Sequence, residues 1–303
     1  MTTPYGKGWL SFEDQIRMLE LRGIEIDNPQ GARDFFRHVN YYRFNSYCQP
    51  FETARHSYAP GTTFSLIRAL YEFDRALRGL LAEAIEIIEI DLRTTVGYFF
   101  GQQHGCFGHI EAGNFHRTFP HADWHGKLQG DAVRSRELFI ENYRAKYQEY
   151  PDLPIWIAVE IMPFGELSRM FRGMTARDQK PVVERYGIPP LVFSSWLHHL
   201  VYVHNLCAHN SRLWDRAWSV KPKLPRALDW MPPMLPDGAR LFATLLIISR
   251  LLQRCPAQGA FASRWRTAVE HHIAALPPVP DGLARMGLPK NWIKHSKWKL
   301  QPV

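Results

Sequence analysis

Residues 64–100 read FSLIRALYEFDRALRGLLAEAIEIIEIDLRTTVGYFF, and they set the architecture that the rest of the chain must follow. Apolar residues recur at helical spacing along this stretch, and charged residues fill the positions between them. Gly79 is its weak point, because a glycine inside a helix costs about 1 kcal/mol relative to alanine. Thr62 or Thr63 is suited to cap the first turn. The stretch therefore predicts one helix of unusual length, from Phe64 to about Phe100.

Shorter helices are predicted on both sides of this stretch. Ser11 is followed three residues later by Asp14, which is a capping-box pattern, and Gly23 closes the helix that the box begins. Further helices are expected after Asn28-Pro29 and over residues 134–150, 191–214 and 238–253. Few convincing strands and no internal repeat are visible. The sequence thus predicts an all-α protein.

Three regions are expected along the chain. Residues 1–60 should form a small N-terminal helical unit, 61–220 a helical core, and 221–303 a helical and loop extension that ends in a basic, tryptophan-containing tail. Within the core, Pro163 and Gly165 should break or kink the segment that follows Pro154.

Composition narrows the class of protein. The 303 residues are 46% hydrophobic and 22% charged, which is typical of a folded, soluble protein. The longest apolar stretch, residues 241–249, is shorter than the roughly 20 residues of a membrane span. The N-terminus lacks the apolar region of a secretory signal, so a cytoplasmic protein that does not enter membranes is expected. The four cysteines are too scattered to indicate a zinc site or a disulfide framework.

The positive charge of the chain favours a polyanionic partner. A formal net charge of +8 makes nucleic acid the first candidate, although a basic surface that only keeps the protein soluble would look the same. Two segments alternate cations with aromatic rings, which suits phosphate contact combined with base stacking. They contain Arg134, Arg136, Tyr143, Arg144, Lys146 and Tyr147, and then Trp292, Lys294, His295, Lys297, Trp298 and Lys299.

A polar cluster interrupts the apolar pattern of residues 200–216, which read LVYVHNLCAHNSRLWDR. Buried imidazole and guanidinium groups without partners cost several kcal/mol, so such a cluster indicates a hydrogen-bond network or a site. His204 and His209 lie about 140° apart around an ideal helix and would not share one stripe. One helix alone therefore makes a poor site, whereas two copies related by a two-fold axis can place such groups side by side.

Residues of these types suit metal-independent cleavage of RNA. Histidine can act as base and as acid near neutral pH, and asparagine and arginine can hold the phosphate. This chemistry needs no metal and no cofactor. The alternative is that His209 is an interior histidine bonded to a carbonyl group. A second histidine-rich segment, residues 101–131, has spacings that fit no standard set of metal ligands, so a loop without metal is expected there.

The polar cluster and other landmarks resemble the Abi-like family of bacterial abortive-infection proteins, the AbiD/AbiF group. Its C-terminal signature reads roughly Arg-Asn-x-Cys-Ala-His-His-x-Arg-Leu-Trp-Asn-Arg, and residues 204–216 follow it. Further landmarks cover nearly the whole chain: LSFEDQ at 10–15, VNYYR at 39–43, PGTTF at 60–64, LYEFDR at 70–75, EIDLR at 89–93, PIW at 154–156, FGELSR at 164–169 and MGLP at 286–289.

The resemblance implies a helical bundle of the HEPN superfamily, whose Arg-x4-6-His motif commonly builds a ribonuclease site across a homodimer. It also implies a toxin that halts phage-infected cells, and association with a structured noncoding RNA. Asn205 and His209 carry over at matching positions, and Arg212 and Arg216 are flanking family positions. Among the departures from the signature, His204 stands where the motif has arginine, and Asn210 stands where it has a second histidine.

Two functions follow from these residues. The first is an endoribonuclease of phage defence with His209 as the principal acid or base, assisted by His204 and Asn205. Phosphate contacts would come from Arg212, Arg216, Arg93, Asn210, Arg144, Lys146 and Lys297. The second is an RNA-binding protein that holds a structured noncoding RNA without cutting it, because the motif arginine is missing. A protein-interaction scaffold with no RNA role is a third and weaker interpretation.

Overall fold

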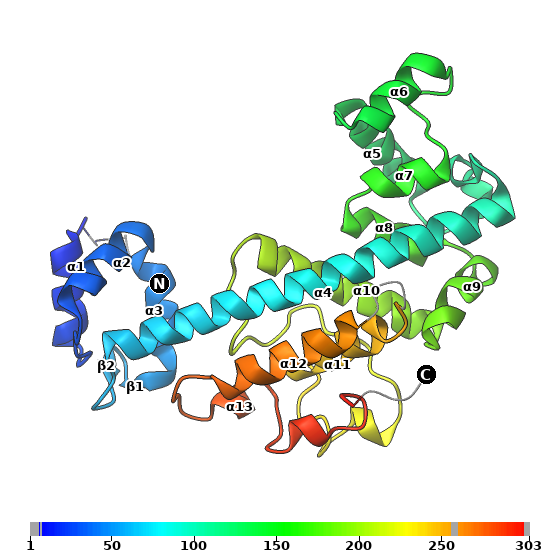
Figure 1. Ribbon diagram of the computed structural model, residues 1–303. Helices are drawn as coiled ribbons and strands as arrows, with labels where there is room; N and C mark the ends of the chain where they lie inside the picture. The colour runs from blue at the N-terminus through cyan, green and yellow to red at the C-terminus, as the bar shows by residue number, and fades with distance from the viewer. Residues whose placement is uncertain (1–5, 7, 256–259, 300–303) are drawn as a thin grey trace. The chain divides into compact units, whose positions relative to one another are not determined.

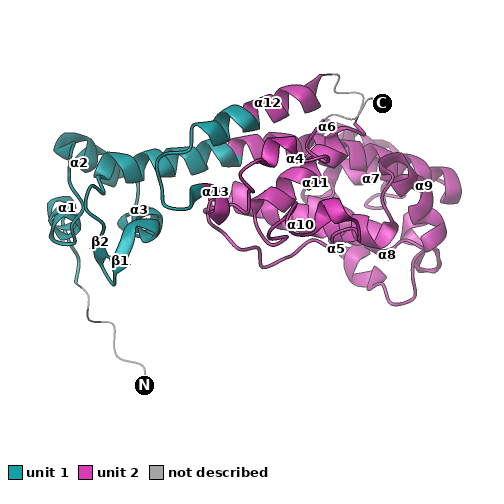
Figure 2. Ribbon diagram, turned by 90° about the horizontal axis from the view of Figure 1, so that it is seen from below, with its two compact units in different colours: residues 1–78, 269–282 teal, residues 79–268, 283–303 magenta. Residues whose placement is uncertain are grey.

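The computed structural model describes residues 6, 8–255 and 260–299 (Figure 1). The chain divides into two compact units, coloured separately in Figure 2. Unit 1 contains residues 1–78 and 269–282, and unit 2 contains residues 79–268 and 283–303. Helices carry the architecture of both units, and the one sheet within the described ranges has two short strands. The all-α prediction is confirmed.

Unit 1 begins with three short helices, each started by a side-chain cap as its sequence predicts. Ser11 accepts a hydrogen bond from the backbone N–H of Asp14, and Asn28 accepts one from Gly31. Asn40 caps the third helix in the same way. The elements in order are α1 (Phe12–Leu21), α2 (Pro29–His38), α3 (Tyr41–Cys48), η1 (Gln49–Phe51) and the antiparallel pair β1 (Glu52–Ala54) and β2 (Ser57–Tyr58).

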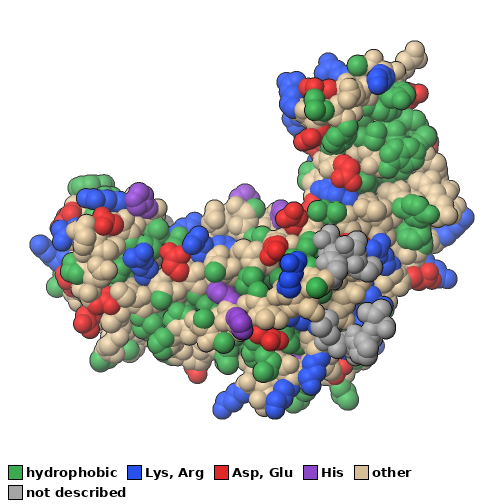
Figure 3. All heavy atoms as spheres, in the orientation of Figure 1, with side chains coloured by type: hydrophobic (Ala, Val, Ile, Leu, Met, Phe, Trp, Pro, Cys, Tyr) green, Lys and Arg blue, Asp and Glu red, His purple; other side chains and the backbone are tan. Residues whose placement is uncertain are grey.

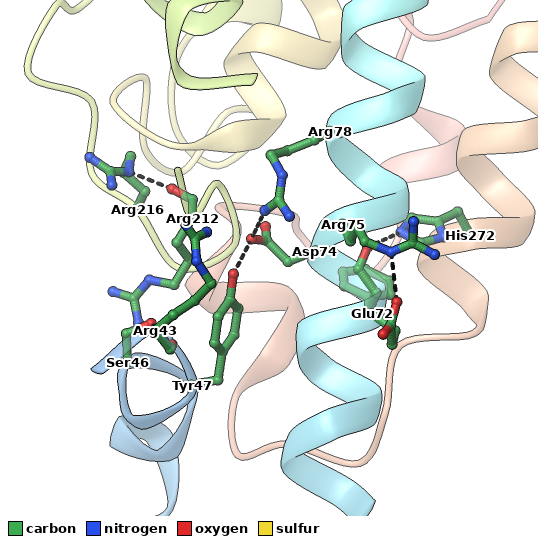
Figure 4. A network of polar contacts seen from close by, with 11 residues as sticks. Arg43, Ser46, Tyr47, Glu72, Asp74, Arg75, Arg78, Arg212, Arg216 and His272 are labelled. Carbon is green, nitrogen blue, oxygen red and sulfur yellow. Dashed lines mark hydrogen bonds and ion pairs between the residues drawn. The ribbon is translucent and has the colours of Figure 1, made fainter. Parts of the chain in front are cut away.

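The core of unit 1 combines an aromatic cluster with a buried polar network. Phe35, Phe36, Phe44 and Phe64 are buried and meet largely edge to face. Beside them in the unit, Asp74 accepts hydrogen bonds from the Tyr47 hydroxyl and from Arg78, each at 2.6 Å (Figure 4). All three side chains of this network are almost completely buried.

The predicted long helix is α4 (Phe64–His104), which continues from unit 1 into unit 2. The hydroxyl of Thr63 accepts a hydrogen bond from the N–H of Leu66 and so caps its first turn. The residues that face inward along α4, from Phe64 to Phe100, are buried at helical spacing. The sequence periodicity therefore located this element closely, and the observed helix runs four residues further than predicted.

Unit 2 contains most of the remaining helices. They are α5 (His121–Arg134), α6 (Leu138–Lys146), α7 (Ile155–Ile161), α8 (Phe164–Gly173), α9 (Ala176–Tyr186), α10 (Pro190–Ala208) and α11 (Leu241–Leu252), with short 3-10 turns η2 (Gly108–Ile110), η3 (Ala112–Asn114), η4 (Leu228–Trp230) and η6 (Trp292–Lys294). Helices α12 (Phe261–Ala274) and α13 (Gly282–Arg285) each have residues in both units.

Helix α11 lies in the centre of unit 2. Its residues are buried on every side, with Arg250 as the half-buried exception, as the apolar stretch 241–249 predicts for a core helix. The fully buried imidazole of His199 in α10 contacts the Thr244 hydroxyl of α11 at 2.9 Å and the Val220 carbonyl at 2.7 Å. No helix within the described ranges is both long and apolar enough to span a membrane.

Further helix boundaries differ from the prediction. Residues 101–131 were expected to be loop, but α5 begins at His121 and occupies the second part of that segment. The helix expected over 134–150 is shorter, because Ser135 and Tyr147 take extended backbone conformations at either end of α6. The helix expected over 191–214 ends at Ala208. The break predicted near Pro163 is confirmed, because that residue separates α7 from α8.

Candidate functional site

The candidate site lies where α10 ends, at a Schellman-type terminus. His209 is the C-cap, and Asn210 takes a left-handed conformation with φ +53°. The N–H of Asn210 donates to the Cys207 carbonyl at 3.0 Å, and the N–H of Ser211 donates to the Leu206 carbonyl at 2.8 Å. Asparagine and histidine are enriched among the non-glycine residues that adopt positive φ. The asparagine at the position of the family's second histidine therefore helps to end the helix.

This terminus presents His209 to solvent. The side chain of His209 is exposed, and so is that of Asn205, whose carbonyl accepts the His209 N–H at 3.0 Å one turn earlier. The alternative in which His209 is an interior histidine bonded to a carbonyl is therefore wrong. His204 is half-buried instead, and its ring meets the edge of Phe164 in α8 with centroids 6.0 Å apart. In the described part of the chain, no hydrogen bond or ring contact joins the two imidazoles.

Beyond the helix, the two candidate arginines lie in an anchored loop. Leu213 and Trp214 are completely buried, and the side chains of Arg212 and Arg216 are half-buried. Arg216 donates from Nε to the Arg212 carbonyl at 2.6 Å (Figure 4). Burial raises the pKa of Tyr202, but the nearby Ser219 and the Arg216 guanidinium outweigh it, and the pKa is lowered overall.

Asp215 fixes this loop, and sequence reasoning did not select it. It has φ +53°, and its carboxylate contacts Arg240 at 3.1 Å and Arg285 at 2.8 Å. The side chain of Asp215 is only 11% exposed, so these contacts are well shielded from solvent. The sequence offered one indication of this role, which is where the two residues lie. Asp215 belongs to the polar cluster, and Arg285 directly precedes the MGLP landmark.

The structure does not bring Arg93 to His209 through any described contact. Arg93 extends from α4 to α7, where it donates to the carbonyl of Val159, and it also pairs with Glu89 one turn before it. Its side chain is 13% exposed. These partners occupy the guanidinium, so Arg93 is a poor replacement for the missing motif arginine.

The basic residues predicted in the first cation–aromatic segment have mixed surroundings. The guanidinium of Arg144 lies 5.5 Å from the ring centroid of Tyr150, and Lys146 is exposed at the end of α6. Tyr147 is exposed and stacks on the buried Tyr143 with centroids 4.7 Å apart. Phosphate contact by Arg144 and Lys146 remains a prediction, and Tyr147 offers one exposed ring for base stacking.

The second segment does not form a stacking surface. Trp292 is 6% exposed and Trp298 is 1% exposed, and the two rings pack against each other with centroids 5.1 Å apart. His295 is buried as well, and Lys297 pairs with Asp229 at 3.1 Å. The expectation of base stacking by these tryptophans is therefore wrong, because their apolar area is used in the core of unit 2.

The histidines of residues 101–131 differ in burial: one is buried, three are half-buried and His116 is exposed. His109 is completely buried, which lowers its pKa to about 4, and the nearby His125 adds to the effect. His125 contacts Asp152 at 2.8 Å, and His104 contacts Asp178 at 3.1 Å. Throughout the described residues, no three His, Cys, Asp or Glu side chains are grouped as a metal site would require.

Positive and negative side chains are mixed on the one face of the molecule that Figure 3 draws. On the face drawn in Figure 3, Lys and Arg side chains are interspersed with Asp and Glu, and they do not gather in one broad patch. The net charge of +8 is therefore distributed rather than concentrated on that face.

Comparison with known proteins agrees with the landmarks in the sequence. A family model described as Abi-like protein matches residues 34–215, which is more than half of the chain and includes α10 and the loop after it. No curated protein and no solved structure matches the chain. The family match supports a general role in abortive infection, the bacterial defence against phage. The chain belongs to the Abi-like protein family.

Proposed function

We propose that this protein is a metal-independent endoribonuclease of phage defence, with His209 as its principal acid or base. The observation that carries the proposal is the exposed imidazole at the end of α10, with the exposed Asn205 one turn before it and Arg212 and Arg216 in the loop that follows. Exposure leaves the ring nitrogens accessible to a substrate, which a structural interior histidine would not allow.

The reaction needs a base, an acid and groups that hold the phosphate. A base removes the proton of a ribose 2′-hydroxyl, and the oxygen attacks the adjacent phosphorus. The bond to the 5′-oxygen then breaks, an acid protonates that oxygen, and the products are a 2′,3′-cyclic phosphate and a 5′-hydroxyl. His209 supplies one of the two proton transfers, and Asn205 and the arginines of the loop position the phosphate.

A second copy of the chain would supply the other proton transfer. His204 packs against Phe164, so a single α10 presents one exposed imidazole at this end and not two. An isologous dimer duplicates every group across its axis and would set a partner copy's His209 beside the first. The HEPN resemblance favours the same arrangement, and it also suggests a structured noncoding RNA as a regulator.

The rival function is RNA binding without cleavage, and one observation favours it. The position of the motif arginine is filled by the half-buried His204, and Arg93 is already engaged by Glu89 and the carbonyl of Val159. The fixed cation of the motif position is therefore missing, and Arg212 or Arg216 would have to replace it. The exposed basic side chains would still bind RNA.

The test is RNA cleavage by the full-length protein in EDTA. His209→Ala should abolish cleavage, whereas His198→Ala should retain it, because His198 is also an exposed histidine of α10 but lies three turns earlier. Cyclic phosphate ends on the fragments would identify the chemistry. His204→Arg restores the family residue and should increase the rate.

Two outcomes separate the candidates. Intact RNA with wild type and with His204→Arg, together with binding that weakens steeply as salt rises, would support the binding protein and contradict the nuclease. Absence of both cleavage and binding would contradict both RNA functions and leave an interaction scaffold.

A further inference from the structure

Unit 1 contains a pocket that the proposed nuclease site does not use. It has a volume of about 540 Å³ and lies among α1, the start of α3 and the chain before α1. Pockets that bind small organic ligands commonly measure about 300–1,000 Å³. The pocket is therefore large enough for a ligand of that class.

Aromatic rings form much of the pocket wall. Tyr42 is 62% exposed, and its ring stands nearly perpendicular to that of Tyr41, with centroids 5.9 Å apart and an interplanar angle of 84°. Phe12 lines the pocket from α1 and is partly exposed, and Phe36 is buried behind Tyr41. Exposed flat rings of this kind are stacking surfaces for planar heterocycles.

Amide groups add hydrogen-bonding capacity beside these rings. The Asn40 side chain accepts the Tyr42 N–H through its oxygen at 2.8 Å, which leaves its NH₂ group as the donor end. Asn45 accepts from the Tyr58 hydroxyl at 3.4 Å in the same way. An asparagine amide can read the edge of a nucleobase, which presents neighbouring donors and acceptors.

The charge of the lining points to an anionic ligand. Arg22 donates to the Tyr41 hydroxyl at 2.8 Å and thereby holds one side of its guanidinium at the pocket. Burial raises the pKa of Tyr41, so the hydroxyl remains protonated and accepts this bond as a neutral group. Among the described residues that line the pocket, none is an aspartate or a glutamate. A cationic ligand would find no counter-charge there, whereas a phosphate would.

We infer that this pocket binds an unpaired nucleotide. The base stacks on Tyr42, its edge meets the amides of Asn40 and Asn45, and the phosphate is held by Arg22. The nucleotide can be free or can belong to a single-stranded segment of RNA, because both present the same base and phosphate. The residues that line the pocket include none of those assigned to the proposed nuclease site, so its occupancy does not depend on cleavage.

Binding to the full-length protein tests the inference. The probes are nucleoside 5′-monophosphates, measured by calorimetry, and short fluorescent single-stranded oligoribonucleotides, measured by anisotropy. Tyr42→Ala should weaken binding about tenfold, or about 1.4 kcal/mol, by removing one stacking contact, and Tyr42→Phe should retain binding. The matched control is Tyr98→Ala in unit 2, because Tyr98 is 65% exposed and lies outside this pocket.

A second comparison isolates the phosphate. The wild type should bind a nucleoside monophosphate more tightly than the nucleoside, and Arg22→Gln should remove that difference. Saturable binding of either probe that Tyr42→Ala weakens and Tyr98→Ala spares supports the inference, and the probe that binds identifies the source. Lack of binding by both probes, or equal loss in Tyr42→Ala and Tyr98→Ala, overturns it. Cleavage by the Tyr42→Ala protein reports on the proposed nuclease independently.

Discussion

The buried Tyr47–Asp74–Arg78 network should contribute strongly to the stability of unit 1. Tyr47 is 1% exposed, Asp74 is 0% and Arg78 is 5%, and both hydrogen bonds to Asp74 measure 2.6 Å. Removing one member of a buried ion pair typically costs about 3–5 kcal/mol, because the other charge stays buried. Asp74→Asn should therefore destabilise the protein by about 3 kcal/mol or more. Tyr47→Phe removes a hydrogen bond to a charged group and should cost about 1.5–3 kcal/mol.

A surface pair on the same helix provides the control for this prediction. Arg75 and Glu72 lie 2.7 Å apart, but their side chains are 67% and 42% exposed (Figure 4). Exposed pairs contribute about 0–1 kcal/mol, so Glu72→Gln should cost less than about 1 kcal/mol. Urea unfolding followed by far-UV circular dichroism measures all three variants. If Asp74→Asn cost no more than Glu72→Gln, the prediction would be contradicted, because burial would then not amplify the interaction.

Three further perturbations probe packing and titration. The pKa of both buried His109 and buried His199 is lowered to about 4, below the ordinary value near 6.5, so the unfolded state binds more protons between these values. The free energy of unfolding should be highest above pH 6.5 and should fall as the pH drops toward 4, by about 2 kcal/mol per histidine at pH 5. In His109→Phe, the melting temperature should therefore depend less on pH between pH 7 and 5 than it does in the wild type. An unchanged dependence of the melting temperature on pH would contradict the burial argument. Asn210→Ala should destabilise the protein by about 1 kcal/mol because residue 210 has a positive φ, whereas Asn210→Gly should be tolerated. Equal melting temperatures for the two variants would show that the backbone at residue 210 is not strained by an alanine. A side chain at Gly97 would start 3.2 Å from Val159, so Gly97→Leu should cost about 1–3 kcal/mol in urea unfolding, and a neutral effect would show that α7 can move away.

Local sequence patterns were sufficient for several helices but not for their ends near the site. Helix α4 was predictable because its apolar period persists over many turns, and α1 because Ser11 and Asp14 form a cap. The end of α10 was not, because the apolar pattern continues through Leu213 and Trp214 after the helix stops. Those residues are buried in the loop through tertiary packing, which periodicity cannot distinguish from a helical face.

The placement of the candidate site residues could be predicted only in part, and their roles stay predictions. His209, Asn205, Arg212 and Arg216 lie at or just after the end of α10, as the spacing of the polar cluster allows. Cation–aromatic alternation failed at the C-terminal tail because it does not show whether a tryptophan is exposed or buried. Long-range contacts could not be predicted from local sequence patterns either, since the partners of Asp215 are 25 and 70 residues away in the sequence.

The most direct test compares the rates at which purified wild type and His209→Ala cut single-stranded RNA in EDTA, with His198→Ala as the matched control. We expect the His209→Ala rate to fall by a factor of about 10²–10⁴, the usual contribution of a general acid or base, with an unchanged melting temperature because the side chain is exposed. His198→Ala should cut at the wild-type rate. Equal rates for wild type and His209→Ala, or no cutting by any of the three proteins, would contradict the nuclease assignment.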